Sequence, residues 1–103
     1  MRKCDVSMKD LSALTARTGD EFAMFTKGGY RLIVRGNSIG VKIGIEEAAA
    51  LAALGYRWSG HTHPGSGELS KMASRGDVEV LKAFGQSQSA IYDSVGRYEI
   101  FRR

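Results

Sequence analysis

The segment His61-Thr62-His63-Pro64, which holds both histidines of the chain, places the strongest demand on any fold that this sequence adopts. It follows a strand-like run, and residues i and i+2 of a strand project from the same face, so both imidazoles can point at one ion. Ser74 and Asp77 stand three apart at the start of an amphipathic run, and on a helix they would share a face. The fold therefore has to bring the end of a strand to the beginning of a helix.

His61, His63 and Asp77 are the predicted metal ligands, because two imidazoles and one carboxylate form a catalytic zinc set that leaves a fourth position open for water. Zinc lowers the pKa of such a water to ~7, so that it can attack a carbonyl near neutral pH. The reaction also needs a proton shuttle, usually a carboxylate that is not itself a ligand. The upstream candidates are Asp20, Glu21, Glu46 and Glu47. We favour Glu21 because it opens a hydrophobic strand, whereas the last two resemble residues in the first turn of a helix.

Hydrophobic periodicity and turn residues predict an alternation of helices and strands. Helices are expected over 8–17, 46–54 and 75–84, and strands over 21–27, 30–35, 56–60, 89–92 and 97–101, with a further short strand over 41–43. The helix over 46–54 is the clearest, since it has an acidic first turn, an alanine-rich body and Gly55 directly after it. The order α-β-β-α-β-α-β-β predicts an α/β (α+β) protein with one domain over residues 1–103.

Composition and charge narrow the classes of partner. The net charge of +4 comes from basic residues scattered along the chain without a block of like charges, so the sequence does not predict a dedicated nucleic-acid surface. Cys4 is the only cysteine, which excludes an internal disulfide and favours an intracellular environment. No apolar run reaches the ~18 residues of a membrane-spanning helix, and no apolar signal-peptide segment follows Met1-Arg2-Lys3. We therefore expect a soluble domain without a membrane partner.

Several of these residues also have a purely structural explanation. Ser74 can cap the helix that begins at Arg75, and Asp77 can interact with the dipole of that helix, but both roles are compatible with catalysis. Trp58 is expected in the core rather than at the substrate. Cys4, close to the N-terminus, is not expected to act as a nucleophile.

A second metal pattern overlaps the first. Gly55, His61, His63 and Glu68 are spaced as in the first motif of the cupins, which would make Glu68 the third ligand. Cupins need a further histidine on a later strand, and this chain has none. They also need an almost all-β chain, which the predicted helices contradict. We therefore prefer Asp77 as the third ligand.

Gly60-His61-Thr62-His63-Pro64, together with Ser74-Arg75-Gly76-Asp77, resembles the signature of the JAMM metalloproteases, also called the JAB or MPN-plus family. The predicted order of elements agrees with that family, and Glu21 lies in a segment that looks like its glutamate strand, although Met24 stands where a glycine is frequent. The resemblance covers nearly the whole chain and implies an MPN-like domain with a mixed central β-sheet flanked by helices. One departure is the loop over 64–76, which is longer than in the family.

By this resemblance, His61, His63 and Asp77 would bind Zn²⁺. Glu21 would carry a proton from the zinc water to the leaving amine, and the Ser74 hydroxyl would stabilise the oxyanion of the tetrahedral intermediate. The implied activity is that of a zinc peptidase or isopeptidase acting on a peptide or protein amide. The chain lacks obvious insertions of the kind that grip ubiquitin, so deubiquitination is not expected.

The segments 56–65 and 81–86 also look like the JAB-type modules at the C-termini of large secreted bacterial proteins of the polymorphic toxin systems. That resemblance implies a toxin effector with a cognate immunity protein as its partner. Such a chain would act in the bacterial cytoplasm or be delivered as the C-terminal module of a secreted protein. Two alternatives stay open: a non-proteolytic JAB-fold binding module or effector, and a metal-dependent nuclease, which the positive net charge suggests.

Overall fold

The computed structural model describes residue 2 and residues 5–37, 43–65 and 74–103. Its helices and strands are α1 (Met8–Thr18), β1 (Phe22–Lys27), β2 (Tyr30–Arg35), α2 (Ile45–Ala53), β3 (Arg57–Thr62), α3 (Arg75–Ala83), β4 (Gln88–Tyr92) and β5 (Tyr98–Arg102). This order confirms the predicted α+β arrangement. The strand expected over 41–43 lies mostly outside the described residues, and the cupin ligand Glu68 lies wholly outside them. Within the described ranges, no helix has the length and apolar character that crossing a membrane requires.

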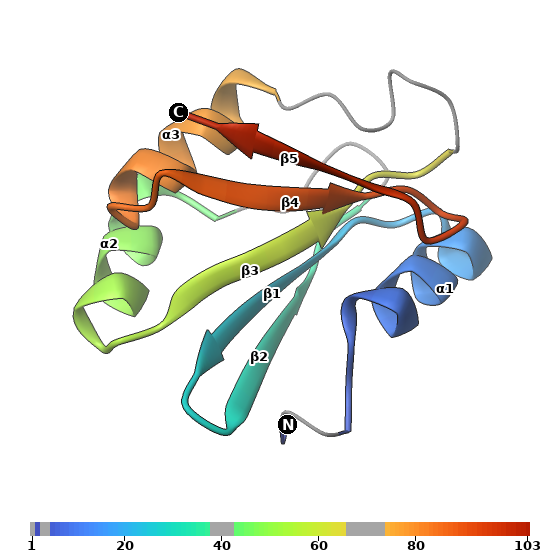
Figure 1. Cartoon of the computed structure of the whole chain (residues 1–103), viewed down its shortest axis with the longest axis horizontal. Helices are drawn as coiled ribbons and strands as arrows, with labels where there is room; N and C mark the ends of the chain where they lie inside the picture. Colours follow the sequence, from blue (N-terminus) through green and yellow to red (C-terminus); the bar gives the residue numbers. More distant parts are fainter. Residues whose placement is uncertain (1, 3–4, 38–42, 66–73) are drawn as a thin grey trace.

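The five strands form one mixed sheet in the order β2-β1-β3-β4-β5 (Figure 1). β1 pairs antiparallel with both β2 and β3, and β4 pairs antiparallel with β5. β3 and β4 are parallel, so the chain has to cross over between them, and α3 lies in that crossover. β3, the strand that carries the first histidine, is consequently the central strand of the sheet.

Helices cover both faces of the sheet, with α1 on one face and α2 and α3 on the other (Figure 1). The buried residues of the larger core, beneath α2 and α3, are Ala23, Phe25, Ala48, Trp58, Leu81, Phe84, Ile91 and Phe101. Those of the smaller core, beneath α1, are Val6, Leu11, Phe22 and Met24. β1 contributes to both cores because successive strand residues point to opposite faces. The predicted core position of Trp58 is confirmed.

β3 extends beyond the predicted strand over 56–60 and includes His61 and Thr62. Both neighbouring strands support the extension: His61 lies opposite Ala23 of β1 and Ile91 of β4, and Thr62 lies opposite Tyr92 of β4. The N–H of His63 continues this pairing by donating to the Tyr92 carbonyl at 2.9 Å. The two imidazoles therefore project from a backbone that the neighbouring strand holds in place.

Candidate metal centre

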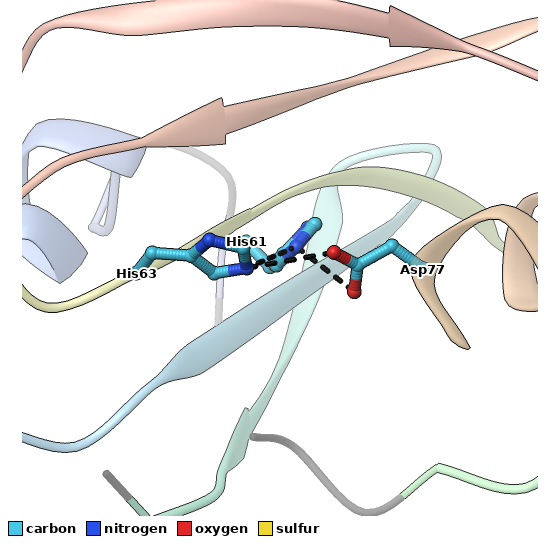
Figure 2. Close-up of side chains that lie close together, drawn as sticks. All are labelled: His61, His63 and Asp77. Carbon is cyan, nitrogen blue, oxygen red and sulfur yellow. Dashed lines mark hydrogen bonds and ion pairs between the residues drawn. The ribbon is translucent and has the colours of Figure 1, made fainter. Parts of the chain in front are cut away.

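The end of β3 and the first turn of α3 bring His61, His63 and Asp77 together, with the carboxylate pointing from the helix toward both imidazoles (Figure 2). The Nε2 atoms of the two histidines lie 3.1 Å apart. The Asp77 Oδ1 atom is 3.2 Å from Nε2 of His61, and its Oδ2 atom is 3.5 Å from Nε2 of His63. The three side chains predicted as ligands therefore converge.

The spacing of these three side chains fits a small divalent cation. Among the residues that the structure describes, they form a group whose potential ligand atoms all lie within 4.8 Å of one another. A tetrahedral ion about 2.0–2.1 Å from each ligand atom would hold those atoms about 3.3 Å apart. The two Nε2 atoms, 3.1 Å apart, lie close to that value, and each is approached by a different oxygen of the Asp77 carboxylate, at 3.2 and 3.5 Å. Three protein ligands would leave the fourth position for water or substrate.

His61 is held in the neutral form that a metal requires. The residue is 2% exposed, and this burial lowers the pKa of its imidazole, although the hydrogen bond to Asp77 acts in the opposite direction. A neutral imidazole offers a nitrogen lone pair to a cation, whereas an imidazolium does not. Burial therefore favours the neutral imidazole, which is the form that binds a cation.

The helix cap of α3 positions Asp77. Ser74 is the N-cap residue: its Oγ accepts the Asp77 N–H at 3.1 Å, and its own N–H donates to Asp77 Oδ2 at 2.8 Å. Burial would raise the pKa of Asp77, but the hydrogen bonds from His61, His63 and Ser74 outweigh burial and hold the pKa well below its usual range. Asp77 is therefore a fixed, charged carboxylate. The Ser74 hydroxyl still has its proton to donate, because accepting a hydrogen bond does not use it.

Glu21 lies beside the three-residue group, directly before β1. Its backbone is fixed, since its N–H donates to the Asn37 carbonyl at 2.9 Å and its carbonyl accepts from Gly36 at 2.8 Å. Its Oε1 atom is 3.6 Å from Nε2 of His63, and the residue is 8% exposed. Burial raises the pKa of the Glu21 carboxyl to about 7; the charge of His63 lowers this pKa, and the negative charge of Asp77 raises it further. A carboxyl that titrates near neutral pH can both accept and release a proton.

The other carboxylates considered as proton shuttles are placed differently. Asp20 accepts two hydrogen bonds from the Arg35 guanidinium, at 2.9 and 2.6 Å. Glu46 and Glu47 are exposed in the first turn of α2. The geometry therefore supports Glu21 over these three.

Two residues that we did not single out from the sequence, Thr62 and Thr15, connect the elements around the site. Thr62 is fully buried, accepts the Phe22 N–H at 2.9 Å and shares a 2.5 Å hydrogen bond with the Thr15 hydroxyl of α1. Because Phe22 follows Glu21, this contact fixes the glutamate relative to the two histidines. One signal was available in the sequence: Thr62 lies between two ligands that share a face, so it must point toward the opposite core, where a hydroxyl needs a partner.

Comparison with known proteins gives no match, whether to a protein-family model, to a curated protein or to a solved structure.

Proposed function

We propose that this chain is a zinc-dependent hydrolase of the JAMM type, which cleaves an amide bond in a peptide or protein as a peptidase or isopeptidase. The observation that carries the proposal is the convergence of His61, His63 and Asp77 with a buried carboxyl, Glu21, beside them. The order of motifs along the chain, Glu21 before the histidines and Ser74-x-x-Asp77 after them, supports the same assignment.

Two histidines and one carboxylate also bind iron(II) in oxygenases, so the ligand set by itself does not decide the metal. Glu21 favours zinc and hydrolysis. Hydrolysis of an amide requires a group that removes a proton from water and returns it to the amine, and a carboxyl with a pKa of about 7 is suited to both transfers. Oxygen activation at an iron centre does not require such a residue.

Each residue of the site has a distinct part in the proposed reaction. A bound zinc ion would lower the pKa of a water molecule and polarise the substrate carbonyl. Glu21 takes a proton from the attacking water and passes it to the nitrogen of the leaving amine. The Ser74 hydroxyl donates a hydrogen bond to the oxygen on which negative charge develops. Asp77, held by the α3 cap, keeps its orientation while charge moves within the site.

Metal analysis of the purified chain tests the first part of this proposal. We expect about one zinc per chain, and loss of the metal in the His63→Ala variant. Zinc should also raise the unfolding temperature of the wild-type chain, because a ligand that binds only the folded state stabilises it. A wild-type chain that takes up no metal would contradict the proposal, and stoichiometric iron in place of zinc would contradict the hydrolytic assignment.

The Glu21→Gln variant tests the proton shuttle. We expect it to keep its zinc and to lose about 10²–10⁴-fold in turnover, while Glu47→Gln, which changes an exposed carboxylate, keeps full activity. The substrates are mixed peptides and isopeptide-linked conjugates in ¹⁸O-labelled water, and mass spectrometry detects label in each new carboxylate. Unchanged turnover in Glu21→Gln would assign the shuttle to another residue. Zinc binding without any cleavage by the wild type would indicate a binding module.

On the resemblance of segments 56–65 and 81–86 alone, we further propose that the chain acts as a bacterial toxin effector, which pairs with an immunity protein. Expression in a bacterial cytoplasm should then arrest growth, and the His63→Ala variant should be harmless. Arrest that persists in His63→Ala would separate toxicity from the metal site.

A further inference from the structure

The ring of His61 is not oriented in the way that is usual for a metal ligand. A ligating histidine almost always donates its second ring N–H to a carboxylate, a carbonyl or water, which fixes the orientation of the ring. In the described part of the chain, Nδ1 of His61 is buried and has no hydrogen-bond partner. Some other contact must therefore hold the ring so that Nε2 faces His63 and Asp77.

Aromatic rings supply that contact. The indole of Trp58 stacks on the His61 imidazole, with 4.8 Å between centroids and 18° between ring planes. Phe101 meets the same imidazole edge-on, with centroids 5.7 Å apart and planes at 90°. Trp58 and Phe101 also pack against each other at 5.6 Å, so the imidazole occupies a corner formed by two mutually supporting rings. Stacked and edge-to-face arrangements are the favoured geometries of such pairs.

A β-bulge makes the stacking of Trp58 on His61 geometrically accessible. These residues are three apart on β3, and in a regular strand they would point to opposite faces. In the pairing of β1 with β3, Met24 lies opposite Gly60 and Phe25 lies opposite Trp58, so Ser59 is an extra residue on β3. The extra residue shifts the alternation by one, which places Trp58 and His61 on the same face.

Trp58 itself is held rigidly. The Gln86 side chain forms a peptide-like pair with the Trp58 backbone: its Oε1 accepts the Trp58 N–H at 2.6 Å, and its Nε2 donates to the Trp58 carbonyl at 3.0 Å. The Ser89 hydroxyl donates to the same carbonyl at 3.1 Å. These bonds fix the backbone of Trp58. Its indole is held by ring packing against Phe25 and Phe101, because Nε1 is buried and has no hydrogen-bond partner among the described residues.

We propose that Trp58 is the positioning residue of the metal centre, which orients the ligand His61 by stacking in place of a hydrogen bond at Nδ1. It also stabilises the loaded state: an imidazole bound to a divalent ion carries part of the positive charge, and the face of an indole attracts positive charge. The inference rests on the proposed metal site, but it concerns how this chain builds that site.

Zinc affinity of three variants, measured by competition with a chromophoric chelator, tests the proposal. Trp58→Leu should bind zinc about 10–100-fold more weakly than the wild type, the range for loss of a contact that orients a ligand. Trp58→Phe keeps a flat ring and should rescue most of the affinity. Phe84→Leu is the matched control, because Phe84 is buried in the same core and its ring stacks on Phe25 at 5.4 Å rather than on Trp58 or His61. It should lose stability while leaving zinc affinity within about twofold, as expected of a core residue that orients no ligand.

The unmodified chain provides a second measurement, which stays informative if Trp58→Leu does not fold. Trp58 is the only tryptophan, so all tryptophan emission reports on it. Zinc should change that emission up to one equivalent, and the Asp77→Asn variant should show no change at the same zinc concentration. Bound zinc without a change in emission, or undiminished affinity in Trp58→Leu, would overturn the positioning role and leave the metal site intact. Absence of zinc from the wild type would instead overturn the proposed function.

Discussion

Two helices of this chain begin with the same motif, Ser-x-x-Asp, and only one of them contributes to the site. At the start of α1, the Ser7 N–H donates to Asp10 Oδ2 at 2.7 Å and the Asp10 N–H donates to Ser7 Oγ at 3.3 Å. At the start of α3, Ser74 and Asp77 form the same pair of bonds at 2.8 and 3.1 Å. Both are capping boxes that share these two backbone-to-side-chain hydrogen bonds.

The two motifs differ in what lies beyond the helix. Asp10 is exposed, and the contacts described above are to Ser7 within its own cap. The Asp77 side chain is 16% exposed, and both of its oxygens also approach the Nε2 atoms of histidines on β3. The comparison shows that the capping box fixes the carboxylate but does not give it a chemical role. Packing against β3 gives Asp77 that role.

The largest predicted difference between the two motifs is the change in zinc affinity when each aspartate is replaced by asparagine. An asparagine oxygen can still accept the N–H of the N-cap residue, so both helices keep their caps. Asp77→Asn should nonetheless weaken zinc binding by about 100-fold or more, because it removes a charged ligand. Asp10→Asn should leave zinc affinity unchanged. Isothermal titration of both variants measures the contrast, and equal affinities would mean that Asp77 is only a cap.

The pH dependence of stability should also distinguish the two motifs, in metal-free protein. The hydrogen bonds that outweigh burial keep the pKa of Asp77 well below its usual range. A depressed pKa contributes stability that is present above the unfolded-state pKa of about 4 and disappears as the pH falls through the folded-state pKa. The difference in unfolding free energy between wild type and Asp77→Asn should therefore shrink by about 1–2 kcal/mol between about pH 5 and 2.5.

Urea unfolding with a chelator at each pH provides this measurement. Asp10→Asn, measured in parallel, shows what an exposed carboxylate contributes in the same capping geometry. If the difference in unfolding free energy between wild type and Asp77→Asn stays constant across this pH range, the histidine contacts do not lower the pKa of Asp77.

The order of elements and the two local pairs in the candidate site were predictable because they depend on short spacings. Residues two apart on a strand and residues three apart on a helix share a face wherever those elements lie, so His61 with His63, and Ser74 with Asp77, are paired by local geometry. The acidic start and alanine-rich body of α2 are equally local, and its bounds differ from the predicted 46–54 by one residue at each end. These features follow from backbone periodicity and not from the remainder of the fold.

The features that complete the site could not be predicted because they depend on distant partners. The hydrogen bond between Thr15 and Thr62 joins residues 47 apart in the sequence, and the Gln86 side chain bonds to the backbone of Trp58 on β3, 28 residues away. The bulge at Ser59 depends on the pairing of β1 with β3; Gly60, directly after it, is the residue type that often marks a bulge, but it does not give the register. The capping motif of α3 also occurs in α1, so the motif alone does not bring Asp77 to the histidines; the packing of α3 against β3 does.

The smallest predicted difference between the two motifs is the effect of replacing their serines on zinc affinity. Replacing either Ser7 or Ser74 with alanine removes one side-chain acceptor at a helix start, which should cost about 1 kcal/mol of unfolding free energy in each case. The consequences for the site should differ, because the Ser74 hydroxyl holds the N–H of a proposed ligand whereas Ser7 holds that of an exposed carboxylate. Ser74→Ala should therefore weaken zinc binding by about three- to tenfold, and Ser7→Ala should not change it. Ser74→Thr, which keeps a capping hydroxyl, should restore the affinity; if it does not, Ser74 acts on the site through something other than the cap.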